Sequence, residues 1–272
     1  MVEVVTEQDV RTFAEFHRGE VRRAPLKSLP IIDFSPYAKG GSEAERTQVA
    51  MQIRQALIDI GFFYLVGHGI AAEELDGLVE QAHRFWALPL AERMKLSDVP
   101  SAQGLGYTPP GGTDGAAVVD TREFFSATRE LVPGEPEYPG RRGSLSIWPS
   151  ESQLPGFERY MKAHIVKRLH VAKLLFQAFA RGLGLPEDWF EATHRYVSVT
   201  LALNYYAPVD RAKADSTKWG ISPHSDYGSF TLLSQDSLGG LEIRNAAGEW
   251  IAAGPIPGAF VVNIGDLFQR WT

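Results

Sequence analysis

The chain has 272 residues, of which 44% are hydrophobic and 22% are charged, and its net charge is −6 at neutral pH. This length and composition predict a globular protein with a sizeable core, and the acidic balance argues against a nucleic-acid partner, because phosphate binding needs a basic surface. The absence of cysteine excludes disulfides, iron–sulfur clusters and thiol nucleophiles, and no apolar run reaches the roughly 20 residues of a membrane span. We therefore expect a soluble, cytoplasmic protein with no membrane partner.

The first half of the chain is predicted to be mainly helical. Ser42 and Glu45 have the spacing of a capping box, and apolar residues then recur at helical intervals up to Gly61. The stretch "FFYLV" at 62–66 predicts a short buried strand, and a second amphipathic helix ends before Pro89. Residues 100–150 are rich in glycine and proline, which is typical of a long connector with loops.

A long amphipathic helix is predicted to begin at about Gly156 and to end at the Gly-then-Pro sequence of residues 182–186. After residue 195 the hydrophobic period changes from 3.6 to 2, as expected for a strand in "YVSVTLALNYY". Leu201 and Leu203 then fall on a core face, and Asn204 and Tyr206 on a polar face that we expect to line a cavity.

Further strands are predicted from "SFTLLSQ", "GGLEIR", "EWIAAG" and "GAFVVNIG". Helices followed by strands favour a sheet sandwich or barrel with helices packed outside it. We expect an N-terminal helical and loop region at 1–150 and a core region with the long helix at 151–272.

The motif His224-Ser225-Asp226 lies in "SPHSDYGSF", a stretch with the composition of turn and strand. In an extended chain residues i and i+2 point to the same side, so the imidazole of His224 and the carboxylate of Asp226 converge. Completed by a second histidine, this pair forms the facial triad of non-heme Fe(II) oxygenases. On the motif alone, a surface hydrogen bond between the two side chains is the simpler interpretation.

The surrounding sequence favours the metal site. Residues 199–264 contain "LNYYAP", "SPHSDYGSFTLLSQD" and "GGLEIRNAAGEWIAAGPIPGAFVVNIGD", and "LPIIDFS", "GFFYLVGHGI", "HRFWALPLAERMK", "GYTPPG" and "DTREFFS" precede them in order. These stretches resemble the 2-oxoglutarate/Fe(II)-dependent oxygenases of the isopenicillin N synthase-like family. The resemblance implies an α+β fold with a double-stranded β-helix (jelly roll) flanked by helices, and 151–272 as the catalytic core.

The resemblance also implies site residues and cofactors. His224 and Asp226 match two ligands of Fe(II), and Tyr206 matches the tyrosine that contacts the C5-carboxylate of 2-oxoglutarate, with Asn204 beside it on the cavity face. The implied reaction consumes O₂ and couples 2-oxoglutarate decarboxylation to hydroxylation or another oxidation of a small molecule. Two alternatives stay open: an oxidase of the same family that omits 2-oxoglutarate, and a non-catalytic binding protein on this fold.

Four other histidines and Asp266 are interpreted as structural residues. His68 lies in a Gly-His-Gly turn, and we expect His83, His164 and His170 to be capped or exposed helix residues. Asp266 is expected to belong to a turn that positions strands.

The substrate is expected to be neutral or apolar. Many members of the resembled family carry a basic residue two places before the asparagine of this strand, and here that position is Ala202. Tyr107, Phe124 and Phe125 are candidate pocket residues, although plain core aromatics are an equal interpretation of these positions.

No histidine follows Asp226 in the sequence. In the resembled family a distal histidine ligand and an arginine that binds 2-oxoglutarate follow the equivalent of "NIGDLFQRWT". An open strand edge next to Phe268 and Trp271 would promote aggregation. We therefore expect the natural chain to continue past Thr272 and to supply both residues.

Overall fold

The computed structural model describes residues 29–97, 105–111, 119–129, 146–192, 194, 197, 199–208, 218–245 and 248–272. Its backbone forms two compact units that are interleaved along the chain. The first contains the described residues within 81–162 and 199–224, and the second contains those within 29–80, 163–197 and 225–272. The boundary near residue 150 that the sequence suggests stays a prediction.

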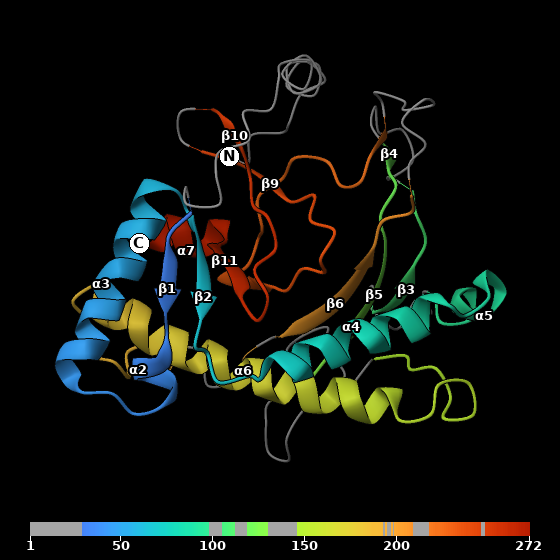
Figure 1. Cartoon of the computed structure of the whole chain (residues 1–272), viewed down its shortest axis with the longest axis horizontal. Coiled ribbons are helices and arrows are strands. Elements are labelled where there is room, and N and C mark those ends of the chain that lie inside the picture. Colours follow the sequence, from blue (N-terminus) through green and yellow to red (C-terminus); the bar gives the residue numbers. More distant parts are fainter. Residues whose placement is uncertain are drawn as a thin grey trace. The chain divides into compact units, whose positions relative to one another are not determined.

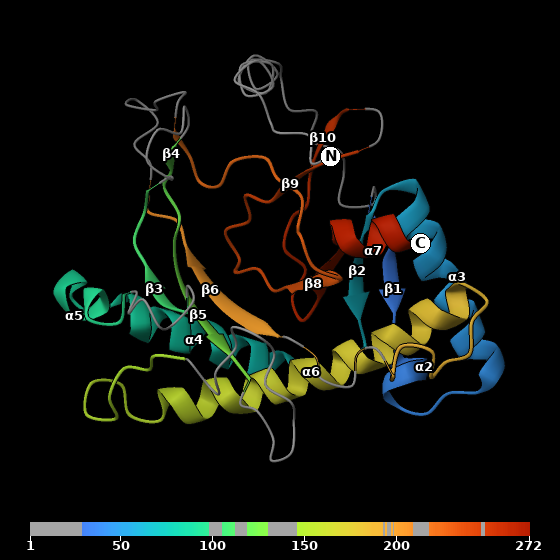
Figure 2. The ribbon, with the colours of Figure 1, turned by 180° about the vertical axis from the view of Figure 1, so that it is seen from behind.

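The second unit is built on a four-stranded sheet with the order β1-β2-β11-β8. The strands β1, β2 and β11 are labelled in Figure 1, and β8 in Figure 2. The strands are β1 (Ile31–Asp33), β2 (Phe62–Val66), β8 (Phe230–Leu233) and β11 (Phe260–Ile264). β2 pairs in parallel with β1, whereas β11 runs antiparallel to both β2 and β8. A separate hairpin joins β9 (Glu242–Arg244) to β10 (Trp250–Ala252).

Both faces of β2 are buried, as its continuous apolar sequence predicts. Phe63 and Leu65 join a cluster with Phe260 and Val262, while Tyr64 faces a second cluster that contains Val261. This division follows the period of two in a strand, and it explains why neither face of "FFYLV" is polar.

Among the described helices, three lie wholly within this unit and two are shared with the first unit. α2 (Ser35–Ala38) and α3 (Glu43–Asp59) follow β1, and the capping box of Ser42 and Glu45 begins α3 as predicted. α6 (Phe157–Gly182) buries one apolar face and ends where Gly184 has a φ of 74°, a left-handed conformation that glycine adopts readily. α7 (Asp266–Trp271) follows β11. α4 (Ala72–Trp86), like α6, has residues in both units.

The first unit contains a three-stranded antiparallel sheet with the order β3-β5-β6, seen from behind in Figure 2. β3 is Gly106–Thr108, β5 is Glu123–Thr128 and β6 is Thr200–Tyr205. A two-stranded parallel pair joins β4 (Val119–Asp120) to β7 (Lys218–Trp219), and the short helix α5 (Leu90–Met94) precedes β3. The predicted strand at 196–206 is thus observed from Thr200, and residues 195, 196 and 198 lie outside the described residues. None of the described helices is long and apolar enough to cross a membrane.

His164 corrects one expectation from the sequence. It is only 3% exposed rather than a solvent-facing helix residue, and its Nε2 accepts a hydrogen bond of 2.8 Å from Nε of Arg168. Arg168 also donates to the carbonyl oxygen of Leu232 at 2.7 Å, which ties α6 to β8. Burial, with a further contribution from Arg168, lowers the pKa of His164 to about 3.

We predict that His164 makes the folded protein sensitive to acid. Its pKa is depressed in the folded state, so its contribution to stability is present above the ordinary value of 6.5 and is lost as the pH falls from 6.5 towards 3. At pH 5 the expected loss is about 2 kcal/mol, from 1.36 kcal/mol per pH unit. In His164→Gln, which retains an acceptor for Arg168, the loss of stability between pH 7 and pH 5 should be smaller by about that amount in urea unfolding. An unchanged difference would show that His164 does not titrate in this range.

Candidate metal and co-substrate site

His224 ends a segment of the first unit that follows β7. Its side chain is exposed, and its Nδ1 lies 2.8 Å from the carbonyl oxygen of Ser222. A carbonyl oxygen only accepts, so Nδ1 carries the proton and donates it. That hydrogen bond selects the tautomer and orients the ring, so that Nε2 is the nitrogen through which this side chain would bind a metal.

Asp226 belongs to the second unit, where two neighbouring strands hold its carboxylate. Its Oδ2 accepts a hydrogen bond from Oγ1 of Thr231 on β8 and one of 2.8 Å from Nδ2 of Asn263 on β11. Thr231 and Asn263 are cross-strand partners in the sheet. Both bonds converge on Oδ2, so the arrangement fits a carboxylate that binds a metal through Oδ1 alone.

The backbone around Asp226 is fastened by the end of β11 and the start of α7. The N–H of Asp266 donates to the carbonyl oxygen of Asp226 at 2.7 Å, and the N–H of Gly265 donates to that of Ser229 at 2.9 Å. The carboxylate of Asp266 accepts a hydrogen bond of 2.8 Å from the hydroxyl of Ser225, between the two candidate ligands. Asp266 therefore positions this turn, in keeping with its expected structural role.

The donor set suits Fe(II) when it is completed by one more ligand. An imidazole nitrogen and a carboxylate oxygen, two residues apart and each oriented by an outer hydrogen bond, are two parts of the 2-His-1-carboxylate triad. Among the described residues, no group of three histidine, cysteine, aspartate or glutamate side chains is placed to hold a metal. The described residues thus include the two candidate ligands that the sequence predicts.

Asn204 lies on β6 opposite the buried face of that strand, and Tyr206 directly follows the strand. Leu201 and Leu203 are buried on the opposite face, whereas Ala202 is exposed and Asn204 is half-buried. The ring of Tyr206 lies against the backbone of Gly220, where an added Cβ would come within 3.0 Å of it. Gly220 therefore leaves room for this tyrosine. Burial of the hydroxyl raises the pKa of Tyr206 although the whole side chain is 48% exposed, and this effect exceeds the opposing one of Arg122.

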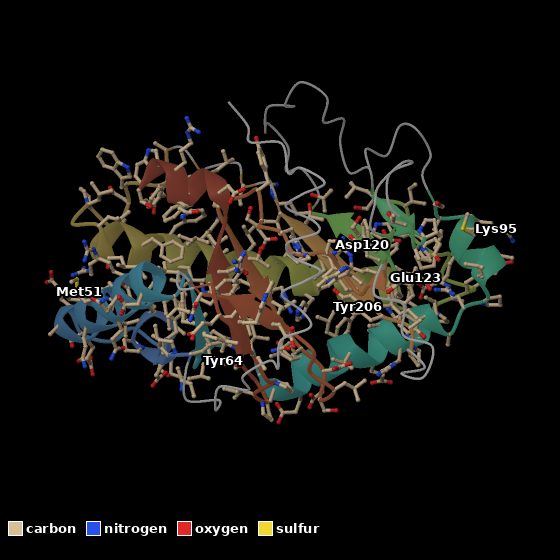
Figure 3. The ribbon with its side chains drawn as sticks, turned by 90° about the horizontal axis from the view of Figure 1, so that it is seen from above. Met51, Tyr64, Lys95, Asp120, Glu123 and Tyr206 are labelled. Atoms are coloured by element: carbon tan, nitrogen blue, oxygen red, sulfur yellow. The ribbon has the colours of Figure 1, made fainter. Side chains whose placement is uncertain are left out.

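Phe124 is the candidate pocket residue that the structure brings to this face. It pairs with Asn204 across the β5–β6 ladder, and the guanidinium of Arg122 lies over its ring at 4.7 Å. Nη1 of Arg122 also lies 3.4 Å from Oδ1 of Asn204. Asp120, Glu123 and Tyr206 are labelled in this unit in Figure 3.

Tyr107 and Phe125 lie on the other face of the same sheet. Phe125 packs in an aromatic cluster with Phe85 and Phe157, and both candidates are 1% exposed. The hydroxyl of Tyr107 donates to Glu123 at 2.5 Å, and burial followed by this interaction raises its pKa to about 12. The structure does not bring these two residues to Tyr206 and Asn204, and the core interpretation of both positions fits it.

Several residues that support the candidate ligands were not singled out from the sequence. Asn263 had a detectable signal, because it is the polar residue inside the apolar strand "FVVNI". Thr231 had none, since threonine is common in strands. Asp120, Ser222 and Arg122 also had none, because their partners lie about 80 to 100 positions away in the chain, a separation that no local pattern reports.

The fold and these two oriented donors define the class of mononuclear non-heme iron enzymes. Two family models match the chain: the N-terminal region of non-haem dioxygenases in morphine synthesis over residues 29–151, and the 2OG-Fe(II) oxygenase superfamily over residues 198–272. The chain belongs to the 2-oxoglutarate/Fe(II) oxygenases of the isopenicillin N synthase-like type.

Individual relatives agree with this placement. The 2-oxoglutarate-Fe(II) type oxidoreductase ppzC of Metarhizium rileyi is 35% identical, over 94% of this chain and 73% of its own length. A homoarginine-6-hydroxylase of Oryza sativa subsp. japonica is 30% identical, over 91% of this chain and 78% of its own length. The crystal structure of a full-length Neurospora crassa protein in complex with alpha-KG has a TM-score of 0.79 at 29% identity, over 89% of this chain and 74% of that one.

These comparisons confirm the main expectations from the sequence. The fold is the α+β jelly roll flanked by helices. The protein is an Fe(II) oxygenase that uses 2-oxoglutarate and O₂ in the hydroxylation or other oxidation of a small molecule.

Gly265 offers a test of how the Asp226 turn is held. A Cβ at this position would lie 2.2 Å from the carbonyl oxygen of Gly228 and 2.7 Å from that of Asp226, so the turn must shift. We predict that Gly265→Ala costs about 1–3 kcal/mol of stability in urea unfolding and weakens Mn(II) binding by at least tenfold. Gly228→Ala is the matched control, because nothing lies within 4 Å of its Cβ position. Equal behaviour of the two variants would contradict the prediction.

Proposed function

We propose that His224 Nε2 and Asp226 Oδ1 are two of the Fe(II) ligands and that Tyr206 binds the C5-carboxylate of 2-oxoglutarate. The observation that carries this assignment is that each candidate ligand has hydrogen bonds to other residues. His224 donates to the carbonyl oxygen of Ser222, and Asp226 accepts from Thr231 and Asn263. These bonds are made by Nδ1 of His224 and Oδ2 of Asp226, the atoms that would not bind the metal. Metal-binding side chains need such outer partners, whereas a His–Asp pair on a protein surface does not.

The protein side chains bind and orient, and they do not carry out the oxidation themselves. Bound Fe(II), with 2-oxoglutarate and O₂, supplies the oxidising power that no side chain has. His224 and Asp226 hold the metal in one orientation, and their outer partners prevent the imidazole and the carboxylate from rotating.

Tyr206 is suited to donate a hydrogen bond to a carboxylate. A tyrosine hydroxyl is ordinarily protonated at neutral pH, and burial raises its pKa further, so the group acts as a donor. Arg122 lies beside the same strand end, where its positive charge would favour an anionic co-substrate. Asn204 completes this face of β6 with a side-chain amide.

We propose a substrate that is neutral or apolar where it meets Ala202 and Phe124. Arg122 is a positively charged residue that lies beside Asn204 and Tyr206, where the co-substrate would bind. The exposed Ala202 contributes no charge. Another structure of the Neurospora crassa protein contains thymine, a small neutral molecule, whereas the Oryza relative is named for homoarginine, which is charged. The support for a neutral substrate is therefore the residue at 202.

We also propose a cytoplasmic location and the absence of nucleic-acid and membrane partners. The net charge of −6 supports the absence of a nucleic-acid partner, because an acidic surface repels phosphates. Cell fractionation with an antibody against the protein tests the location, and recovery with membranes or chromatin would contradict it.

Removal of either candidate ligand should abolish the coupled reaction. We expect the protein with Fe(II), ascorbate and a library of small molecules to convert 2-oxoglutarate to succinate. His224→Ala and Asp226→Ala should lower this rate at least about a hundredfold, because each leaves the metal short of one ligand. His170→Ala, which removes an exposed helix histidine, is the control. Failure of the wild-type protein to form succinate, or full activity of either ligand variant, would contradict the proposal.

Substitution of Tyr206 should affect the co-substrate selectively. A hydrogen bond to a charged group contributes about 1.5–3 kcal/mol, so Tyr206→Phe should raise the KM for 2-oxoglutarate roughly tenfold to hundredfold. Metal affinity should not change. Tyr205→Phe is the matched control, since Tyr205 lies on the opposite face and stacks on Trp86 at 5.2 Å. If both variants show the same KM, Tyr206 does not bind the co-substrate.

A further inference from the structure

Residues 120–122 hold the segment that leads to His224. The N–H and the Oγ1 hydroxyl of Thr121 donate to the carbonyl oxygen of Trp219 at 2.7 and 2.8 Å, and the N–H of Arg122 donates to that of Gly220 at 2.9 Å. These bonds extend the parallel β4–β7 pair. They attach the irregular segment after Trp219 to residues that lie about a hundred positions earlier in the chain.

The carboxylate of Asp120 continues this attachment to Ser222. Oδ1 of Asp120 accepts a hydrogen bond of 2.8 Å from the backbone N–H of Ser222 and one of 2.6 Å from its hydroxyl. The carbonyl oxygen of Ser222 in turn accepts the Nδ1–H bond of His224 at 2.8 Å. A continuous path of hydrogen bonds therefore runs from Asp120 through Ser222 to His224.

The path is stiff at its central residue. Ser222 precedes Pro223, and a residue before proline is restricted to extended backbone conformations. The two hydrogen bonds that Ser222 donates to Asp120 fix the position of Ser222, and the restricted backbone then sets the direction of its carbonyl oxygen. The carbonyl oxygen of Ser222 is thereby placed to accept the Nδ1–H bond of the exposed His224 side chain and to orient its ring.

We propose that Asp120 is a positioning residue for the candidate iron ligand His224, that it acts through Ser222, and that it thereby sets the affinity for Fe(II). The inference rests on the proposed role of His224 as a ligand. Loss of the outer partner of a metal ligand lowers metal affinity about tenfold to hundredfold, and Asp120 is expected to have an effect of this size although it does not contact the metal.

The chain contains a matched control for the chemistry of this interaction. Oδ1 of Asp33 accepts hydrogen bonds from the N–H and the hydroxyl of Ser35, at 2.9 and 2.6 Å. This is the same pair of bonds that Asp120 makes with Ser222, but no candidate ligand follows Ser35. A general loss of stability through an unpaired serine should appear in both places, whereas a loss of metal affinity should appear at Asp120 alone.

The experiment titrates the full chain anaerobically with Fe(II), and in parallel with Co(II), whose visible absorption reports the ligand geometry. The proteins are the wild type, Asp120→Ala, Asp120→Asn, Ser222→Ala, Asp33→Ala and His224→Ala. We expect tenfold to hundredfold weaker binding and an altered Co(II) spectrum for Asp120→Ala. Asp120→Asn retains an acceptor oxygen and should be intermediate, as should Ser222→Ala, which loses one of the two bonds. Asp33→Ala should bind as the wild type does.

The outcomes separate this inference from the proposed function. Wild-type affinity and spectrum in Asp120→Ala, with weakened binding in His224→Ala, would overturn the inference alone. Unchanged binding in His224→Ala would overturn the role of His224 and the inference together. An equal loss in Asp33→Ala and Asp120→Ala would reduce the effect to general destabilisation and would also overturn the inference. Should Asp120→Ala fail to fold, Asp120→Asn and Ser222→Ala decide the matter by the same criteria.

Discussion

Backbone hydrogen bonds to an irregular segment are the constraint on which the candidate site depends. Residues 220–229 carry both candidate ligands but lie outside regular strands and helices. Their peptide groups therefore need partners from other elements. Arg122 supplies one in the first unit, and Gly265 and Asp266 supply two in the second. The segment before His224 is thus bonded to a residue earlier in the chain, and the segment that begins at Asp226 is bonded to residues later in the chain.

The alternation of side chains in β6 has a second consequence for function. The strand contributes Leu201 and Leu203 to the core and Asn204 to the opposite face, and Tyr206 follows directly after it. Any shift of its register by one residue would exchange these two sets. The ladder with β5, which runs from Glu123 to Thr128, fixes that register and brings Phe124 beside Asn204. The packing of the aromatic core and the placement of the co-substrate residues thus depend on the same strand pairing.

Much of the local structure could be predicted because short-range chemistry determines it. The capping box of Ser42, the buried strand at 62–66 and the alternation in β6 each follow from residues within a few positions of one another. The choice among Tyr107, Phe124 and Phe125 could not be made in this way, because an aromatic residue in a strand suits a core and a pocket equally well. The β5–β6 register separates them, since it assigns Phe124 and Phe125 to opposite faces.

The sequence by itself predicted the class of fold and the two candidate ligands, through motifs that resemble a known family, and it predicted the two faces of β6 through the period of two. The physical reason is that motifs and periods are encoded in residues that lie close together in the chain. Only the tertiary structure decided which side chains hold those ligands in place. Asp120, Thr231 and Asn263 reach their partners through strand pairing and chain reversal. Such contacts between distant residues depend on the folded geometry and leave no local pattern.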